Sequence, residues 1–429
     1  MDQYIIYTSF RFPTFTTSNI INTALSYGVK IESLGESQKI GIAPKSSFLI
    51  YKFPTDEDAK LIASKSIVVK SVSKLICSAE TWEQIINFAK NYEHSINNGS
   101  YAIKIETCNK KLHQDLQTPY INELISALNL TSTVDFKKPN TKIMIFMDFE
   151  SGNVDKPYKV QLGIYLGEGN FEFPDKFTLK KRAFINKTSM ESTLAIHSAV
   201  HGLAGPGKLI YDPFVGSGSI LVAAASLGSL VVGSDLDMKA MTEQGYKEQK
   251  NVSIRQNFVQ YNLEKNFVGV CRSNFLNDRV VPRNLDAIVT DPPYGIREKI
   301  VAESGLSPLH PLLLHLYEYA AKNLKVGGRL VYWLPCGYDL ETDKDLPKHN
   351  VLKLVSNCQQ YLNSRYCRHL ITLEKIKEFD GSPVLFDNFE ASWLKVHDIV
   401  FKPNEEKNKH VRKAMLKEKN QRKKNLHLE

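Results

Sequence analysis

The sequence predicts an α/β fold for the C-terminal half of the chain, preceded by an N-terminal α+β region. From Asn186 onward, strand-like and helix-like segments alternate, which is typical of a parallel sheet covered by helices on both faces. Before that point, short half-buried strands are mixed with helices and carry no catalytic constellation. The composition is globular, with 429 residues of which 42% are hydrophobic and 24% charged. It excludes a disordered chain, a collagen-like repeat and a disulfide scaffold.

In the N-terminal region, five segments have the β-rich or alternating pattern that predicts strands. They are Tyr4–Ser9, Phe48–Phe53, Ile67–Ile76, Tyr101–Thr107 and Lys142–Phe149. Capping residues, an acidic first turn and helical spacing of apolar residues predict three helices. The first runs from Thr17 or Ser18 to Tyr27, the second opens at Thr55, and the third follows Thr118-Pro119-Tyr120.

In the C-terminal half, short apolar runs predict strands at Lys208–Tyr211, Leu230–Ser234, Phe267–Cys271, Asp286–Thr290 and Arg329–Leu334. Helices are predicted between them, at Ser219–Leu227, Met238–Lys250 and Leu309–Leu324. The periodicity fades between Gly167 and Lys187, so we expect a linker there. That linker holds a basic cluster, Lys180-Lys181-Arg182, which is a candidate for contacts to RNA.

The charge of the chain is unevenly distributed. The formal net charge is +9, and ten Lys and Arg against four Asp and Glu lie between Lys402 and Glu429. This tail either binds RNA backbone non-specifically or is a solvated, disordered terminus. The sequence shows no signal-peptide pattern and no apolar run of membrane-spanning length, which predicts a soluble, cytoplasmic protein without membrane contact. Six cysteines without CxxC spacing predict reduced, mostly buried thiols and no metal site.

The first motif, Asp212-Pro213-Phe214-Val215-Gly216-Ser217-Gly218, lies between a predicted strand and a predicted helix. Two glycines two residues apart let the backbone turn sharply and approach a ligand closely. The carboxyl end of a strand is where open α/β sheets bind ligands. A leading acid and the missing third glycine argue against a dinucleotide. They favour a ligand with an ammonium group, such as the methionine part of S-adenosylmethionine, over a plain glycine turn.

A second motif, Val231-Val232-Gly233-Ser234-Asp235-Leu236-Asp237, ends the next predicted strand. Asp235 follows the glycine loop by about twenty residues, a spacing that places an acid to accept hydrogen bonds from ribose hydroxyls. Asp237 is better placed to cap the helix that follows.

The third motif, Asp291-Pro292-Pro293-Tyr294, directly follows a predicted strand. Its prolines stiffen the loop and leave carbonyl oxygens free to accept hydrogen bonds. Asp291 and the Pro292 carbonyl can each accept a hydrogen from an exocyclic amine, which localises its lone pair toward an electrophilic methyl. Tyr294 can stack on a base taken out of its helix. The alternative is a structural proline-rich turn.

At these residues the chain resembles the class I S-adenosylmethionine-dependent amino-methyltransferases, whose catalytic domain is Rossmann-like. The resemblance implies that Asp212, Phe214, Gly216, Gly218 and Asp235 bind the cofactor and that Asp291, Pro292 and Tyr294 hold the amine. The segment Lys187-Thr188-Ser189-Met190-Glu191 resembles the one that covers the methionine moiety, which implies contacts from Thr188 and Met190. Where the family usually has an acid against the adenine, this chain has Asn274, whose carbonyl oxygen can still accept; Asp278 is the alternative.

More closely, DPPYGIRE, YCRHLITLEKI and YIIYTSFRFP resemble the catalytic subunits of eukaryotic tRNA guanine-10 N2-methyltransferases. The resemblance implies an RNA-binding THUMP domain and a small zinc-binding activator subunit as partner. The predicted divisions are an N-terminal α+β subdomain at 1–54, the THUMP domain at 55–165, a linker at 166–187, the methyltransferase domain at 188–402 and a basic tail at 403–429.

Three further features have competing interpretations. Arg297, beside Glu298, can contact RNA or form a salt bridge that stiffens its loop. His197 and His201 have metal-ligand spacing but lack a third ligand, which favours ordinary helix histidines. Cys336 lacks the partners of a nucleophile, which favours a buried thiol.

The sequence therefore predicts a tRNA-binding enzyme that methylates the N2 amine of guanosine at position 10. The alternatives are an adenine-N6 methyltransferase on rRNA or DNA, and a non-catalytic RNA-binding subunit with a methyltransferase fold.

Overall fold

The computed structural model describes residues 1–395, except 39, 95, 151–155, 242–252, 278–281 and 295–308, and also residue 399. The chain forms two units. Unit 1 contains Met1–Thr16, Tyr27–Lys39 and Ala43–Phe171, and unit 2 contains Thr17–Ser26, Ile40–Ile42 and Glu172–Glu429. No helix within the described residues has the length and apolar content needed to span a membrane.

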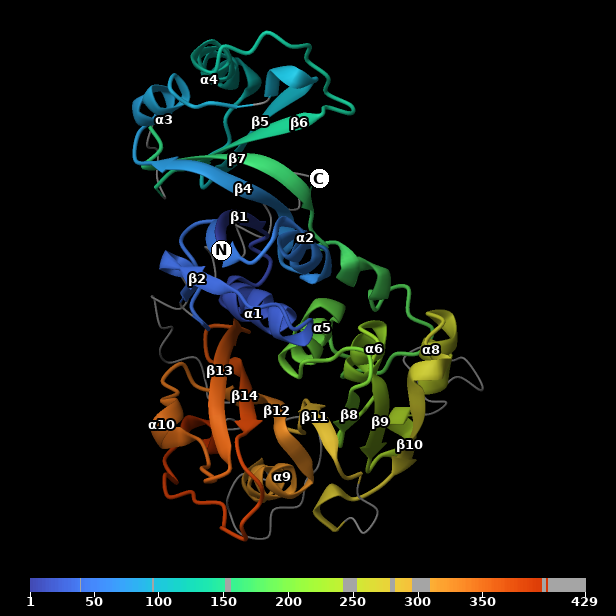
Figure 1. The fold of residues 1–429 in the computed structure, drawn as a ribbon. Helices are drawn as coiled ribbons and strands as arrows, with labels where there is room; N and C mark the ends of the chain where they lie inside the picture. Colours follow the sequence, from blue (N-terminus) through green and yellow to red (C-terminus); the bar gives the residue numbers. More distant parts are fainter. Residues whose placement is uncertain are drawn as a thin grey trace. The chain divides into compact units, whose positions relative to one another are not determined.

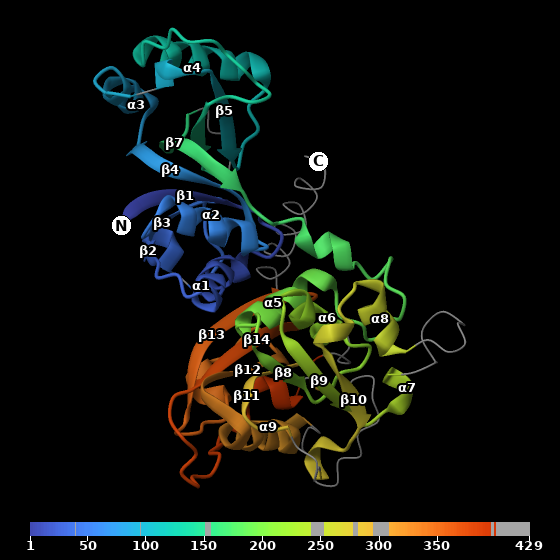
Figure 2. The same ribbon diagram turned by 45° about the vertical axis from the view of Figure 1, so that its right-hand side comes forward.

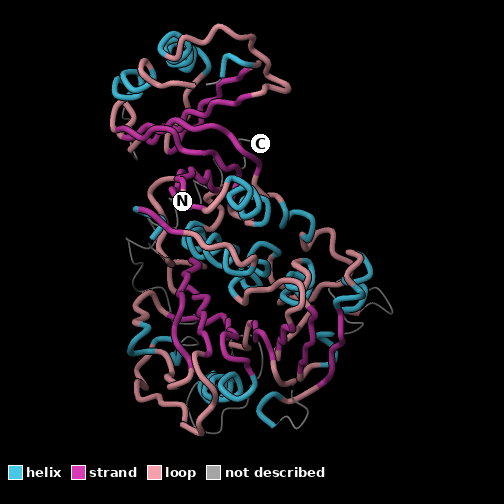
Figure 3. The backbone as a smooth tube through the Cα atoms, viewed as in Figure 1, coloured by secondary structure: helices cyan, strands magenta, loops and turns pink. Residues whose placement is uncertain are grey.

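Unit 1 is built on one seven-stranded sheet; the strands of both units are magenta in Figure 3. In spatial order its strands are β2 (Glu32–Leu34), β3 (Phe48–Phe53), β1 (Asp2–Thr8), β4 (Val69–Ala79), β7 (Lys159–Glu168), β6 (Thr141–Asp148) and β5 (Tyr101–Cys108). Among the strands that the structure describes in this sheet, β5 and β6 pair in parallel and the other neighbours pair antiparallel. Because β1 pairs with β4, the boundary predicted at residue 54 falls inside one continuous sheet.

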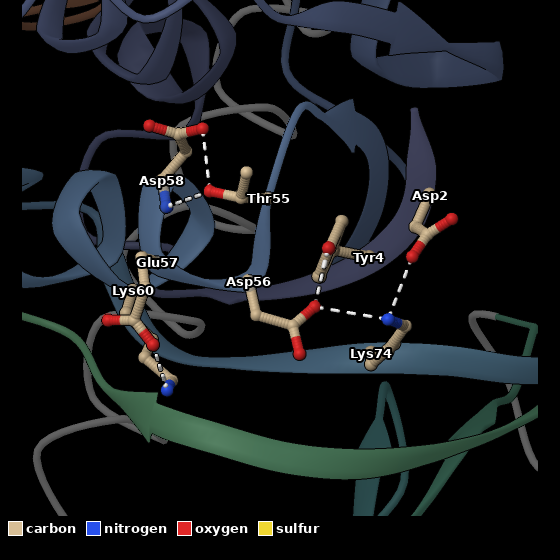
Figure 4. Close-up of polar contacts among 8 residues, drawn as sticks. All are labelled: Asp2, Tyr4, Thr55, Asp56, Glu57, Asp58, Lys60 and Lys74. Carbon is tan, nitrogen blue, oxygen red and sulfur yellow. Dashed lines mark hydrogen bonds and ion pairs between the residues drawn. The ribbon is translucent and has the colours of Figure 1, made fainter.

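The helices of unit 1 are α2 (Asp56–Lys65), α3 (Trp82–Ala89) and α4 (Gln114–Ala127). As predicted, Thr55 caps α2, and its Oγ1 accepts a hydrogen bond from the Asp58 amide at 3.1 Å. Figure 4 shows how the same turn joins the sheet: Tyr4 of β1 donates to the Asp56 carboxylate, and Lys74 of β4 pairs with it. Helix α4 begins before the predicted Thr118, and Pro119 lies inside it.

Unit 2 contains a second seven-stranded sheet, with β10 and β13 at its edges (Figure 1). In spatial order its strands are β10 (Phe267–Arg272), β9 (Leu230–Asp235), β8 (Leu209–Asp212), β11 (Leu285–Thr290), β12 (Leu324–Cys336), β14 (Cys367–Lys375) and β13 (Leu352–Tyr361). The strands from β10 to β12 are parallel, as predicted. β14 and β13, which were not predicted as strands from the sequence, extend this sheet in antiparallel orientation.

Helices cover both faces of this sheet: α5 and α6 lie on one side and α9 on the other (Figure 2). The helices of unit 2 are α1 (Thr16–Ser26), α5 (Ser192–His201), α6 (Ser219–Ser226), α7 (Met238–Met241), α8 (Ile254–Gln260), α9 (Leu309–Asn323) and α10 (Thr342–Asp345). The part of the predicted Met238–Lys250 helix beyond Met241 lies outside the described residues. Short 3-10 turns complete the described chain: Pro13–Phe15, Gly35–Gln38, Ile96–Asn98, Phe173–Phe177, Glu264–Asn266, Phe275–Asn277 and Ser392–Lys395.

Helix α1 is joined to the core of unit 2 by buried hydrogen bonds. Asn19 contacts His197 Nδ1 at 3.2 Å, and the Ser18 hydroxyl contacts His201 Nε2 at 3.1 Å. Arg329 of β12 donates to the Asn22 carbonyl oxygen at 3.1 Å. His197 and His201 are therefore buried helix histidines with side-chain partners, the interpretation that the sequence favoured.

Candidate active site

The glycine-rich loop lies between β8 and α6, at the carboxyl end of a central strand. Gly216 and Gly218 have φ angles of +50° and +78°, in the left-handed region that residues with a Cβ rarely adopt. A Cβ on Gly218 would lie 2.3 Å from Ile254 Cδ1. Both glycines are therefore required by the backbone, and the loop turns as the sequence predicts.

Asp235, at the end of β9, closes this loop from the neighbouring strand. Its Oδ2 accepts a hydrogen bond from the Gly216 amide at 2.8 Å, and its Oδ1 accepts one from the Asp237 amide at 2.9 Å. The acid predicted to bind ribose is thus adjacent to the glycine loop, and two backbone donors fix its orientation.

The Asp291–Tyr294 segment leaves the carboxyl end of β11, beside β8. Thr290, the last residue of β11, donates to Asp212 Oδ1 at 2.6 Å, so the strand ends from which the two predicted loops leave are in direct contact. Pro292 is buried, and Asp291 and Tyr294 are half-buried. The two motifs thus leave the same edge of the sheet, and their joint role as one site remains a prediction.

Asp291 is held by two donors. The Tyr294 hydroxyl donates to Asp291 Oδ1, and Arg368 Nη1 donates to Asp291 Oδ2 at 3.2 Å. Burial raises the pKa of Asp291 even though the Arg368 cation and the Tyr294 hydroxyl both favour the ionised carboxylate. The Tyr294 ring is thus tied back to Asp291, and its stacking role remains a prediction.

Arg368 is the residue of this site to which the sequence gave no role. It lies in β14, its guanidinium carbon is 4.2 Å from the centre of the Trp333 ring, and its Nε donates to Gln360 Oε1 at 2.6 Å. Stacking and hydrogen bonding hold the planar group in one orientation. Its position opposite Pro335 depends on the pairing of β14 with β12, which no local pattern reveals.

Three acids, Asp212, Asp235 and Asp291, end adjacent or neighbouring strands of the sheet. Burial raises the pKa of all three, to about 7 for Asp212. The charges of Asp235 and Asp291 raise the pKa of Asp212 further, while its bonds from Thr290 and the Phe214 amide oppose the rise. Clustered buried and half-buried carboxylates beside a glycine loop fit a cationic ligand, as S-adenosylmethionine is at its sulfonium and ammonium groups.

The remaining predicted cofactor residues flank this centre. The Thr188 amide and hydroxyl both donate to Asn186 Oδ1, and the adjacent Ser189 hydroxyl contacts that of Ser217 in the glycine loop at 2.6 Å. Met190 is buried, and Phe214 packs edge-on against Phe275. Asn274 follows β10 and is exposed; its Oδ1 accepts from the Leu276 amide at 3.2 Å. Asp278 lies outside the described residues.

The predicted RNA-binding residues have different outcomes. Lys180 and Lys181 are exposed, as RNA contact requires. The expectation for Arg182 is wrong, because its side chain is only 3% exposed and donates to the Ser219 hydroxyl and the Phe177 carbonyl oxygen. A cation held this way is a structural residue that fixes the segment before α5. Arg297 and Glu298 lie outside the described residues.

Comparisons with known proteins agree with this organisation. Residues 2–170 match the family described as the Tmrp11 THUMP N-terminal domain, and residues 180–343 match the one described as the RMKL-like methyltransferase domain. The chain is 33% identical over 392 residues to the tRNA (guanine(10)-N(2))-methyltransferase TRMT11 of Bos taurus, covering 80% of this chain and 84% of that protein. It is 31% identical over 439 residues to the Homo sapiens TRMT11, covering 91% and 92%.

Among solved structures, TrmN from Thermus thermophilus is 18% identical with a TM-score of 0.44 and covers 87% of this chain and all of that chain.

Proposed function

The chain belongs to the family of tRNA (guanine(10)-N(2))-methyltransferases, and we propose that it catalyses that reaction, methylating the N2 amine of guanosine 10 in tRNA. The observation that carries the proposal is the hydrogen bond from Thr290, which directly precedes the amine loop, to Asp212, which opens the glycine loop. It brings a cation-binding site and an amine-accepting site to one edge of the sheet. S-Adenosylmethionine supplies an electrophilic methyl group when it is bound.

The residues placed to hold the cofactor are those of the glycine loop together with Asp212 and Asp235. Gly216 leaves room beside the backbone, and Gly218 makes the tight turn against Ile254. Asp235 is oriented by two amides for hydroxyl groups. Asp212 supplies a buried carboxylate for an ammonium group. These carboxylate acceptors and the glycine loop fit the ammonium and hydroxyl groups of the cofactor that the family uses.

Asp291 orients the amine. In the free chain both of its oxygens are occupied, so it must exchange one donor for a hydrogen of the guanine amine. The Tyr294 hydroxyl is the donor released when that ring turns toward the base, and Arg368 then keeps the carboxylate ionised. With Asp291 and the Pro292 carbonyl accepting both amine hydrogens, the nitrogen lone pair points at the methyl carbon. Transfer would form the nitrogen–carbon bond while the sulfur–methyl bond of the donor breaks, and Asp291 or water would take one amine proton.

The test is the Asp291→Ala substitution, assayed with the tRNA substrate and a nucleoside digest. Methyl transfer should be abolished while tRNA affinity is nearly unchanged, because Asp291 acts on the amine and not on the RNA backbone. Asp286→Asn is the matched control, since Asp286 lies in the same strand, β11, and pairs with the surface residues Lys208 and Lys325. Normal turnover by the Ala variant would contradict the site. Appearance of N6-methyladenosine in place of N2-methylguanosine would contradict the substrate.

We also propose that a small zinc-binding activator subunit covers the β10 edge of unit 2. β10 ends the described sheet, and an edge strand carries unpaired amide and carbonyl groups. Large apolar side chains are exposed on or beside it: Leu230, Leu236, Val268 (61% exposed) and Leu276. Exposed apolar side chains gathered in this way are typical of a surface that a partner protein covers.

Val268→Asp tests this partner surface. The substitution should abolish co-purification of the activator, while Val326→Asp, an equally apolar exposed site on β12, should not. If the partner still co-purifies with the Val268 variant, the surface is assigned wrongly.

A further inference from the structure

Two thiols and an imidazole meet on one face of unit 2, outside the residues used above. Cys336 ends β12, and Cys367 is its register partner in β14. His369 follows two residues later, so its side chain is on the same face as that of Cys367. The two sulfurs are 4.0 Å apart, and one potential ligand atom from each of the three residues lies within 4.8 Å of the others.

The orientation of His369 leaves one ring nitrogen for a ligand. Its Nδ1 is bonded to the side-chain oxygen of Asn357 in β13, and an amide oxygen can only accept. The proton is therefore on Nδ1, and Nε2 carries the lone pair. Nε2 is buried without a hydrogen-bond partner, in a side chain that is 6% exposed. In metal-binding histidines, the ring nitrogen that does not bind the metal usually donates to an oxygen, which fixes the tautomer.

The sulfur atoms are buried and lie beside polar groups. Cys336 and Cys367 are both 0% exposed. The Gln359 amide donates to the Cys367 sulfur at 3.3 Å. A bound cation would favour the thiolate of each residue, which is the form that binds metals.

We propose that Cys336, Cys367 and His369 bind a thiophilic metal ion, with zinc as the expected occupant. Two sulfurs bound to a tetrahedral zinc lie about 3.8 Å apart, close to the spacing found here. Two thiolates and a neutral imidazole also cancel the charge of a divalent ion, which a buried site requires. The fourth position is left for water or for the Gly337 carbonyl oxygen, which accepts the Cys367 thiol proton at 3.3 Å in the metal-free chain.

The site has a structural consequence for Arg368. Residues 367 and 369 flank it in β14, and alternation directs its side chain to the opposite face. A metal ion at the three ligands would cross-link β14 to β12 at the register that places Arg368 against Asp291. Sequence spacing gives no sign of this site, because the ligands come from two strands that are distant in the chain.

The test compares metal content in wild type, Cys367→Ser and Cys108→Ser, each purified without chelators and with any partner that co-purifies. Wild type should hold one equivalent of zinc more than Cys367→Ser, and cobalt-substituted wild type should show a thiolate-to-cobalt charge-transfer band that this variant lacks. Cys108 is a buried thiol of unit 1, so Cys108→Ser should retain both signals.

Equal zinc contents in wild type and Cys367→Ser would overturn the proposal. So would a Cys336–Cys367 disulfide in metal-free protein isolated without reductant. If Cys367→Ser does not fold, wild type is treated with a zinc chelator. Its melting temperature should then fall and recover on addition of zinc, and an unchanged value would also overturn the proposal.

Discussion

The acids at the ends of β8, β9 and β11 are unequally compensated. Asp291 has the Arg368 cation at 3.2 Å, and Asp235 is stabilised by two backbone amides. Asp212 is fully buried and lies near two other acids, and both effects raise its pKa. Hydrogen bonds from one hydroxyl and one amide oppose them only in part, so its pKa is about 7. The site without its cofactor thus carries electrostatic strain at Asp212 that a cation relieves.

Cofactor binding should therefore release a proton from Asp212. Near pH 7 this group is partly protonated, and an ammonium group beside it lowers its pKa, so affinity should rise with pH up to about 7. Calorimetry in two buffers of different ionisation enthalpy measures the released proton. Asp212→Asn should remove the buffer dependence and weaken binding. A wild-type enthalpy that does not vary with the buffer would contradict the contact between Asp212 and the cofactor.

Arg368 should act as a positioning residue for Asp291. Removing the cation in Arg368→Met raises the pKa of Asp291 further, so the carboxylate ionises only at higher pH. The acidic limb of the kcat profile should shift upward, with a loss of about tenfold or more at neutral pH. Arg368→Lys should restore part of the rate because it keeps the positive charge. It should not restore all of it, because an ammonium group lacks the planar geometry with which the guanidinium bonds both Gln360 and Asp291. An unshifted profile for the Met variant would leave Arg368 with a packing role only.

At the scale of elements, local patterns predicted the strands that carry the site. β3 has the predicted bounds, β9 and β11 differ from theirs by one residue at one end, and β8 is shifted by one residue at both ends. β14 was missed because Arg368, His369 and Thr372 interrupt its apolar pattern, and their partners come from other elements. The two motif loops were therefore predictable, whereas the arginine and the metal ligands depend on non-local strand pairing.

The turn into α6 offers a direct test of why its glycine is needed. Gly218→Ala should lower stability by about 1–2 kcal/mol for the left-handed backbone, plus about 1–3 kcal/mol for overpacking against buried Ile254. Gly207 has a similar φ of +77° with open space around it, so Gly207→Ala should show only the first loss. Thermal unfolding of both variants measures the difference. Equal losses would mean that Ile254 moves aside without cost.

At the scale of the whole molecule, the division into units does not follow the chain order. Thr17–Ser26 belongs to unit 2, although the residues on both sides of it belong to unit 1. The chain thus enters and leaves the methyltransferase unit before the bulk of unit 1 is complete. A predicted catalytic domain at 188–402 lacks the buried partners that α1 supplies to His197, His201 and Arg329.

The fragment Glu172–Glu429 should therefore be less stable than unit 2 within the full chain. Loss of α1 leaves buried nitrogen donors and acceptors unpaired, at about 1–3 kcal/mol each, and exposes the apolar surface beneath the helix. Fusing Thr16–Ser26 to the fragment through a flexible linker should recover most of the melting temperature, and a fused helix carrying Ser18→Ala and Asn19→Ala should recover less. If the bare fragment melts at the temperature of the fused one, α1 is dispensable to the unit. Water would then have to supply the hydrogen bonds that α1 makes with His197, His201 and Arg329.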